Sequence, residues 1–475
     1  MARPLRWVGA MLALALLAAG GTALVLQAQG IAPRALAPYI EKRSSGHNAL
    51  ITGAGEWTSD TLLRLDRGAA TAPSAAIGGI GARSAAVRAP EAGTVRLVAT
   101  SEEARRALAL AEAGDVITFM PGVYRFTQAP LVANHPGTAL ASIVVRAERP
   151  GTVTIEFDLG EGFVVSAPHW HFENLTIRGV CKVQAFCEHA FHVTGGASDF
   201  RSRNNTIIDF NAHFKINGEG GRFPDHGRIE DNTVRNDSVR DTASPVTPVD
   251  LVAASHWRIR RNLISDFVKS GGDRISYGGF AKGAGSDNIF EQNMVLCESR
   301  LQGLPGQRVG LSLGGGATGK PYCRDKRCIV EQEQSEIRAN LIAGCSDDGI
   351  YLNNAAASKV THNTLIDTGG ITVRFPGSSA DVEGNLVDGA IRARNGGELR
   401  LLDNRTTPIS LLYVGYHPVR SLFRHAAGGD FAWEGEPPRR QRGAAFVPDL
   451  CGTQRGATLA YGAFDDIAAC LTRKD

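Results

Sequence analysis

The feature of this sequence that most constrains its fold is an asparagine that recurs ahead of short runs of β-forming residues. The repeat is clearest at Asn174-Leu-Thr-Ile and Asn205-Thr-Ile-Ile. It continues at Asn232, Asn262, Asn293, Asn340, Asn363, Asn385 and, more weakly, Asn404. The spacings are 31, 27, 30, 31, 47, 23, 22 and 19 residues. An irregular period of this length, filled by short strands and turns, is typical of a solenoid.

The residues between the asparagines favour β-strands with one buried face. In the run Trp257-Arg258-Ile259-Arg260 the apolar side chains alternate with charged ones, as they do along a half-buried strand. Asparagine tolerates the left-handed turn conformation and bonds to nearby backbone, so we expect stacked amides to form a ladder inside the solenoid. The sequence therefore predicts an all-β parallel β-helix, with an insertion at 301–327 inside the 47-residue gap.

Four regions are predicted along the 475 residues. Residues 1–30 form a signal anchor or signal peptide, residues 31–93 a flexible Ala/Gly/Pro-rich linker, residues 94–405 the β-helix, and residues 406–475 a C-terminal cap and tail. The β-helix begins with a capping helix that starts at Ser101 and stops at Gly114, followed by a strand over 116–120. A Pro-Gly turn then leads into the repeats.

The N-terminal segment predicts export. Residues 7–26 are uncharged and apolar and follow Arg3 and Arg6; as a helix this run is long enough to cross a bilayer. We expect an uncleaved anchor in the inner membrane, with cleavage near Ala28 as the alternative. The remaining chain is expected to be periplasmic or extracellular. Its eight cysteines, an even number, then indicate disulfides, whose pairing the sequence leaves open.

The charge balance excludes one class of partner. Lys and Arg number 51 against 48 Asp and Glu, with no basic cluster in the chain. Nucleic-acid binding needs clustered cations, so no nucleic-acid partner is expected.

The start of the predicted β-helix carries a family resemblance. The stretch SEEARRALALAEAGDVITFMPGVYRF resembles the N-terminal cap of the right-handed parallel β-helix, or pectin-lyase-like, superfamily. Its A-G-D-x-I-x-x-x-P-G-x-Y pattern is similar to that of the alginate lyase and chondroitinase B family, and SLFRHAAGGDFAWEG resembles the segment that closes such folds. The resemblance implies a protein that acts on an acidic polysaccharide by β-elimination. The alternatives are a non-catalytic glycan-binding or envelope-assembly protein and a C5-epimerase.

Lys282 is the first catalytic candidate. A lyase must neutralise the uronate carboxylate, remove the C5 proton and protonate the leaving oxygen. Lys282 is flanked by glycines, and it matches the place of the lysine in the lyase family. That family carries acidic calcium ligands a few residues earlier, where this chain has Ile275 and Tyr277. We therefore expect no cofactor, with calcium possible only through other ligands, and we assign Tyr277 to substrate binding. A solvated turn lysine is the alternative for Lys282.

Arg374 is the second candidate. It lies 11 residues before Asn385, as Lys282 lies 11 before Asn293. Both are therefore expected on one side of the solenoid, and at ~4.8 Å per coil three coils separate them by about 14 Å. We expect Arg374 to bind substrate at a separate subsite, with an exposed strand arginine as the alternative.

A further group of polar residues is a candidate for acid–base chemistry. These residues are His213, Lys215, Asp225 and His226. The adjacent Asp225 and His226 suit proton transfer in a turn, although capping of that turn explains them equally well.

Two remaining patterns concern carboxylates and metals. Asp347 and Asp348 are adjacent, and neighbouring strand residues point to opposite faces, so only Asp348 is expected to reach a cleft and bind substrate; a plain turn at Asp348-Gly349 is the alternative. His169 and His171 alternate onto one face but have no evident third ligand, so no metal site is predicted.

Overall fold

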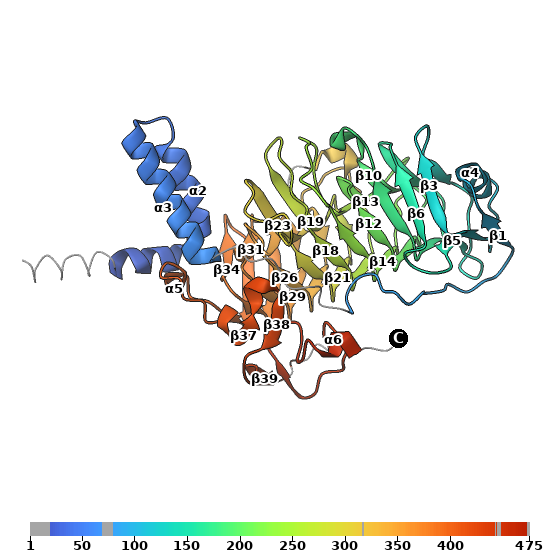
Figure 1. Cartoon of the computed structure of the whole chain (residues 1–475). Helices are drawn as coiled ribbons and strands as arrows, with labels where there is room; N and C mark the ends of the chain where they lie inside the picture. The colour runs from blue at the N-terminus through green and yellow to red at the C-terminus, as the bar shows by residue number, and fades with distance from the viewer. Residues whose placement is uncertain (1–19, 69–78, 316–317, 442, 444–447, 473–475) are drawn as a thin grey trace, which may run out of the picture.

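The computed structural model describes residues 20–68, 79–315, 318–441, 443 and 448–472 (Figure 1). Its body consists of stacked coils that form three long parallel sheets of 12, 11 and 10 strands, which we call sheets A, B and C. The predicted parallel β-helix is confirmed. Helix α4 (Ser101–Ala109) starts at Ser101 as expected, is capped by Thr100 and ends before the expected Gly114; it buries Ala104 and Leu108 against the first coil.

Within each sheet, neighbouring strands come from successive coils and follow the order of the chain. Sheet A contains β1 (Val95–Val98), β2 (Val116–Phe119), β5 (Ile143–Ala147), β8 (Trp170–Glu173), β11 (Arg201–Arg203), β14 (Arg228–Glu230), β17 (Arg258–Arg260), β21 (Ile289–Glu291), β25 (Glu336–Arg338), β29 (Ser358–Thr361), β32 (Ser379–Glu383) and β35 (Glu398–Leu402). Sheet B contains β3 (Gly122–Phe126), β6 (Val153–Phe157), β9 (Thr176–Gly179), β12 (Thr206–Ile208), β15 (Thr233–Arg235), β18 (Leu263–Ser265), β22 (Met294–Leu296), β26 (Leu341–Ala343), β30 (Thr364–Ile366), β33 (Leu386–Val387) and β36 (Arg405–Thr406). Sheet C contains β4 (Leu131–Ala133), β7 (Glu161–Val165), β10 (His189–Thr194), β13 (Ala212–Asn217), β16 (Val249–Val252), β19 (Ile275–Lys282), β23 (Gln307–Leu313), β27 (Ile350–Asn353), β31 (Gly370–Arg374) and β34 (Ala390–Arg394).

The inner faces of the sheets form one continuous apolar core. Phe163, Phe191 and Phe214 occupy one register position of sheet C and stack with ring centroids 5.1 and 5.4 Å apart. Residues at the same position in successive coils therefore pack similar side chains against one another. In this way a solenoid builds a core that no single coil can form.

The asparagine ladder exists, with one correction. From Asn205 to Asn404 each amide contacts the next; Asn293 Nδ2 donates to Asn340 Oδ1 at 3.0 Å. The left-handed residue is the one before each ladder asparagine, such as Gln292 at φ 56°. Asn174, at φ 62°, occupies this preceding position, and Leu175 stands in the ladder column.

The predicted insertion at 301–327 is only partly an insertion. Strand β23 lies inside it and is a regular member of sheet C. The extra residues of this coil form loops on either side of β23, and the second loop contributes to a small sheet of β20 (Gly285–Ser286), β24 (Gln332–Glu333) and β28 (Ala355–Ala356).

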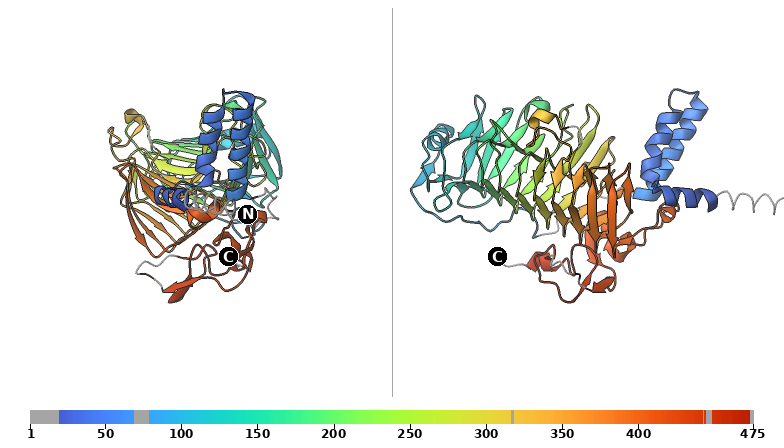
Figure 2. Two further views of the ribbon diagram at one scale, coloured as in Figure 1. Left: turned by 90° about the vertical axis from the view of Figure 1, so that its left-hand side faces the viewer. Right: turned by 180° about the vertical axis from the view of Figure 1, so that it is seen from behind.

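Residues 33–67 differ from the flexible linker expected there. They form a hairpin of two helices, α2 (Pro33–Ser44) and α3 (Ala49–Arg67), which stands at the end of the solenoid where the last coils lie (Figure 2). Alanine-rich composition is compatible with helix, and Asn48 caps α3 by accepting from the Ile51 amide. The Ala/Gly/Pro-rich composition of 31–93, taken as a whole, predicted a linker and did not reveal these two helices.

Residues 79–92 also differ from a free linker, because they run along the solenoid toward its first coil (Figure 1). Their backbone amides are held by side chains of successive coils: Arg83 by Asn204 Oδ1 at 2.6 Å and Val87 by Asn174 Oδ1 at 3.0 Å. We call residues 79–92 the strap.

The C-terminal region packs along sheet B. Phe423, Phe431 and Phe464 join a second apolar cluster with outward-facing residues of sheet B such as Met294 and Leu341. The elements of this region are α5 (Ile409–Leu412), β37 (Phe423–His425), β38 (Asp430–Trp433), β39 (Arg439–Gln441), β40 (Thr458–Ala460) and α6 (Ala469–Thr472).

All eight cysteines form disulfides. The pairs are Cys181–Cys187, Cys297–Cys345, Cys323–Cys328 and Cys451–Cys470.

The predicted membrane anchor at 7–26 falls for the most part outside the described residues. Within the described parts of the chain, no helix combines the length and the apolar composition needed to span a bilayer.

Candidate functional site

The outer face of sheet C carries rows of polar side chains that run along the solenoid. One row, read from β10 to β34, contains His192, Lys215, Asp250, Phe280, Ser312, Tyr351, Thr372 and Arg392. A parallel row at the ends of these strands contains Asn217, Val252, Lys282, Asn353, Arg374 and Arg394. We call this surface the polar face.

Lys282 ends β19 on the polar face. Its Nζ lies 4.3 Å from the centroid of the Phe280 ring, and among the described residues it has no hydrogen bond or ion pair. Burial lowers the pKa of Lys282, while the nearby Asp250 carboxylate opposes that shift. A half-buried amine with a lowered pKa is suited to accept a proton.

Lys215 lies on the same face but is differently paired. Its Nζ contacts Asp250 Oδ2 at 2.7 Å, and Asp250 is buried. Sequence reasoning missed Asp250, because it stands alone between valine and leucine in β16; its register opposite Lys215 was the available signal. Lys215 is therefore a fixed positive charge compensated by Asp250, beside Lys282.

His213, assigned to acid–base work from the sequence, does not reach the polar face. It is fully buried, its Nε2 donates to the Arg235 carbonyl at 3.0 Å, and burial lowers its pKa to about 3. Its role in this structure is to hold a turn.

Asp225 and His226 lie in the turn that leads from sheet C to sheet A. Both Asp225 oxygens accept from Arg324 at 2.8 Å, which ties the loop of the Cys323–Cys328 disulfide to the solenoid. His226 is exposed and stacks on His256 at 4.7 Å. The turn interpretation fits Asp225, since its carboxylate is fully engaged.

A cavity of about 1580 Å³ lies between the helical hairpin and the last coils of sheet C. Its lining brings together three residues that the sequence assigned to substrate binding: Tyr277, Asp348 and Arg374. Further charged residues that line it include Arg34, Arg67, Asp347, Arg392 and Arg394. Arg374 also borders a smaller hollow of about 540 Å³ with Gly315, which lies against the Lys282 side chain.

Asp347 and Asp348 both line the cavity, which corrects the expectation that only one reaches it. They precede β27, which begins at Ile350, so the alternation of strand side chains does not apply to them. Burial, together with the neighbouring Asp347 carboxylate, raises the pKa of Asp348 to about 7. Arg392 contacts Asp348 at 3.4 Å.

Tyr277 and Arg374 are hydrogen-bond donors at this cavity. Burial raises the pKa of Tyr277 to about 12, so its phenol stays protonated at neutral pH, and its ring packs edge-on against Phe280. Arg374 donates to Tyr351 Oη at 3.3 Å and lies three strands beyond Lys282 in the same row.

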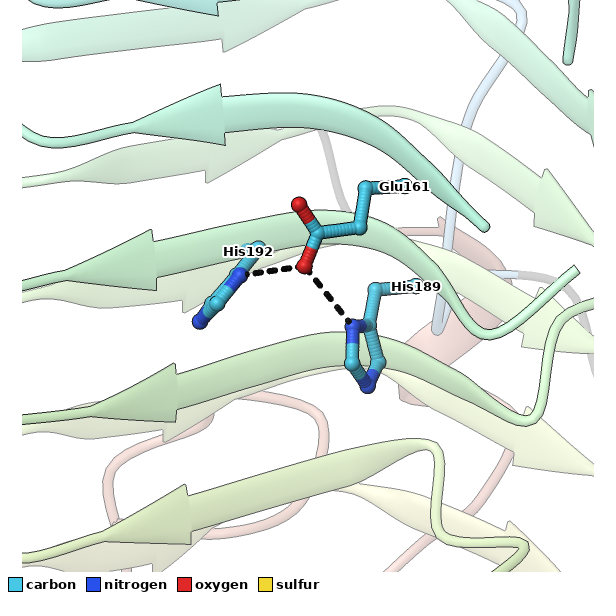
Figure 3. Close-up of side chains that lie close together, drawn as sticks. All are labelled: Glu161, His189 and His192. Carbon is cyan, nitrogen blue, oxygen red and sulfur yellow. Dashed lines mark hydrogen bonds and ion pairs between the residues drawn. The ribbon is translucent and has the colours of Figure 1, made fainter. Parts of the chain in front are cut away.

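A group of three residues at the other end of the polar face was missed. Glu161 Oε1 lies 2.6 Å from His192 Nδ1 and 3.6 Å from His189 Nδ1 (Figure 3). The neighbouring imidazoles of His189 and His192 lower the pKa of Glu161. Residues three apart in a regular strand point to opposite faces, but Ala190 and Phe191 are both fully buried, so β10 departs from alternation.

By contrast, burial lowers the pKa of His171 to about 3, and no metal-binding group forms around His169 and His171 in the described chain.

Comparison with known proteins identifies the fold. No family model and no curated protein matches the sequence. The structure is similar to that of pectate lyase Pel9A, with a TM-score of 0.50 and 15% identity over 76% of this chain and 90% of that chain. It is less similar to an alginate lyase from Paenibacillus sp. str. FPU-7 (TM-score 0.40, 13% identity, 66% and 95% covered) and to the Azotobacter vinelandii mannuronan C-5 epimerase AlgE4 A-module (0.40, 12%, 65% and 92%). This chain thus has a parallel β-helix fold, and its structure is similar to that of pectate lyase Pel9A.

Proposed function

We propose that this protein binds an acidic polysaccharide along the polar face and cleaves it by β-elimination, with Lys282 as the base. The observation that carries the proposal is the state of Lys282: a half-buried amine with a lowered pKa and no ion-pair partner among the described residues. A lysine that only contributes to solubility would remain solvated. A catalytic base, in contrast, needs the lowered pKa that desolvation produces.

The neighbouring cations suit an anionic polymer. In β-elimination the base takes the C5 proton, the C4–O bond breaks, a C4–C5 double bond forms, and the leaving oxygen takes a proton. The step requires that positive charge neutralise the uronate carboxylate. Arg374 and Arg394 lie in the Lys282 row three and four strands away, so they would bind carboxylates of other sugars along the chain.

Tyr277 supports the same subsite from the other side. Its ring and the Lys282 ammonium both contact Phe280, and its protonated phenol is a donor for a sugar or leaving oxygen. Tyr277 therefore remains a substrate-binding residue in the proposal.

Export is part of the proposal. Four disulfides fit an oxidising compartment, where an enzyme acting on extracellular or envelope polysaccharide would work. Attachment through residues 7–26 remains a prediction from the sequence.

Hydrolysis in the cavity is the second candidate function. It is favoured by Asp348, whose pKa of about 7 lets it donate a proton near neutral pH, beside the Asp347 carboxylate. Glycoside hydrolysis uses such a pair of carboxyl groups in different protonation states.

One assay separates the candidates. Alginate, pectate, chondroitin and hyaluronan are each incubated with the full chain, and both ultraviolet absorbance of unsaturated products and new reducing ends are followed. The proposal predicts that both signals rise together on at least one polymer. New reducing ends without absorbance would indicate hydrolysis, and a changed uronate epimer ratio by NMR without cleavage would indicate epimerisation. Binding of a polymer without any reaction would indicate a non-catalytic glycan-binding protein.

A further inference from the structure

Three ligand-type atoms converge at the start of the polar face. Glu161 begins β7, and His189 and His192 come from the adjacent strand β10, where His189 is the register partner of Glu161. The carboxylate oxygen and the two imidazole nitrogens lie within 4.8 Å of one another. Figure 3 shows both imidazoles directed at the same carboxylate oxygen.

The hydrogen bonds around His192 determine which of its ring nitrogens can bind a metal ion. The Asn217 amide nitrogen donates to the Gly218 carbonyl at 3.1 Å, so the Asn217 oxygen faces His192 Nε2 at 2.8 Å. His192 Nε2 must therefore carry a proton, and in the neutral ring Nδ1 presents a lone pair toward Glu161 Oε1. Two acceptors that face each other at 2.6 Å must share a cation, which is either a second proton on His192 or a metal ion bound by both atoms.

His189 distinguishes these two possibilities. Its Nδ1 is buried, points at the same oxygen, and has no hydrogen-bond partner within the described structure. A proton shared by Glu161 and His192 leaves this buried nitrogen unsatisfied, whereas a metal ion would use it as a third ligand.

We propose that Glu161, His189 and His192 bind a divalent transition metal ion of the Zn²⁺ class. Two imidazoles and one carboxylate form a ligand set that Zn²⁺ accepts and that Ca²⁺ and Mg²⁺, which prefer oxygen, do not. Asn217 orients His192 from behind, as second-layer partners of metal-bound histidines do. The Glu161 side chain is 37% exposed, so an ion reaches the site from solvent.

Three protein ligands leave a coordination position open, and this part of the inference rests on the proposed function. His192 is the register partner of Lys215 in the next coil, so the open position faces the same surface as Lys215 and Lys282. A sugar carboxylate is the ligand that this surface would supply. Lys282 lies three strands further, at ~4.8 Å per strand about 14 Å away, so the metal would hold a different sugar from the one that reacts.

Cobalt binding tests the metal site without any polysaccharide. The full chain, carrying no polyhistidine tag and stripped with EDTA, is titrated with Co²⁺ while its visible d–d absorption is recorded. We expect one bound Co²⁺ that Zn²⁺ displaces, with affinity lowered at least about tenfold in Glu161→Gln and in His192→Gln. His256→Gln, which removes an exposed histidine that stacks on His226, is the matched control and should bind like the wild type. No binding by the folded wild type, or unchanged binding by the Glu161→Gln/His192→Gln double variant, would overturn the proposal.

A second titration tests the role in substrate binding separately. The affinity for a polymer that the protein binds is measured with Zn²⁺ and with EDTA. Stronger binding with Zn²⁺, lost in His192→Gln, supports a metal-held carboxylate. Equal affinities would refute that role alone, while failure of both metal-free and metal-loaded protein to bind any of the four polymers would refute the proposed function instead.

Discussion

At the scale of single residues, the polar face carries two lysines, of which only Lys215 has a counter-ion among the described residues. Lys215 is neutralised by Asp250 at 2.7 Å, and Lys282 lies over the Phe280 ring with no ion pair to any residue that the structure describes. Strands β13 and β19, which lie on either side of β16, thus provide a fixed charge and an amine that can give up its proton. We expect these two roles to separate when each residue is replaced.

Replacement of Lys282 should abolish turnover without unfolding the protein. Lys282→Ala removes the base, so kcat is expected to fall by at least about 100-fold, within the range that acid–base groups supply. Arg374→Ala removes a binding charge at a distant subsite and should mainly raise KM. Lys359→Ala, an exposed lysine on sheet A, is the control for loss of a positive charge. Full turnover by Lys282→Ala on the polymer that the wild type cleaves would show that the site is wrongly assigned.

Asp348 should make stability depend on pH in an unusual direction. Its pKa is about 7 in the folded protein against 3.8 for an unperturbed aspartate, so between these values the folded state binds more protons than the unfolded state. The stabilisation is complete below the lower value and is lost as pH rises through the upper one. The Tm of the wild type relative to that of Asp348→Asn is therefore expected to fall from about pH 5 to about pH 8. A difference in Tm that stays constant or grows with pH would contradict the burial of this carboxyl.

At the scale of the structural element, the asparagine ladder links coil to coil. Asn293 Oδ1 accepts from the Asn262 backbone and side chain at 3.0 Å, and its amide donates to Ile259 and Asn340. Every polar atom of this fully buried side chain is thereby satisfied. The ladder provides hydrogen bonds at the turns, where strand pairing is absent.

Replacement of one ladder asparagine should lower the free energy of unfolding more than a surface substitution does. Asn293→Ala leaves buried backbone and amide groups unpaired, which is expected to lower the free energy of unfolding by about 1–3 kcal/mol. Asn134→Ala is the matched control, since Asn134 is exposed. The comparison is made by denaturant unfolding, and equal stability of the two variants would argue against the ladder.

Prediction from the sequence succeeded where a pattern repeats and failed where it breaks. The ladder follows from the repeat, and the position of Lys282 and Arg374 in one row follows from their equal spacing to a ladder asparagine. Glu161, His189 and His192 were missed because β10 departs from alternation between His189 and His192, which no periodic pattern reveals. Strand alternation did not apply to Asp347 and Asp348, because the strand begins at Ile350; the alternative of a turn at Asp348-Gly349 fits this position.

At the scale of the whole molecule, the residues ahead of the solenoid contact both of its ends. The hairpin docks at the last coils, and the strap runs to the first (Figure 1). Composition averaged over 31–93 suggested a linker, because contacts with distant coils leave no local signature. The docking is polar: Arg34, which pairs with Asp66 inside the hairpin, contacts Asp367 of the solenoid at 2.9 Å and donates to the Cys345 carbonyl at 2.7 Å.

The hairpin should come loose when Arg34 is removed. Arg34 is 3% exposed and Asp66 is 1% exposed, so Arg34→Ala leaves a buried carboxylate without its partner. Breaking such a pair typically costs about 3–5 kcal/mol. We expect thermolysin to cut within 33–67 at least about tenfold faster, as cleavage tracks local opening. Arg43→Ala, which removes an arginine stacked on exposed Tyr39, should leave the rate unchanged. Equal cleavage rates of the two variants would show that Arg34 does not hold the hairpin.

The most direct test of the account is whether an acidic polysaccharide binds on the polar face. Binding of alginate, pectate, chondroitin and hyaluronan to the full chain is measured by isothermal titration calorimetry, and two double variants are compared on a polymer that binds. Lys282→Ala/Arg374→Ala removes two charges from the outer face of sheet C, and Arg201→Ala/Arg228→Ala removes two from the outer face of sheet A. The account predicts that the first pair weakens binding at least about tenfold, or about 1.4 kcal/mol, while the second leaves it unchanged. Binding to none of the four polymers, or loss of binding only in the sheet A variant, would contradict it.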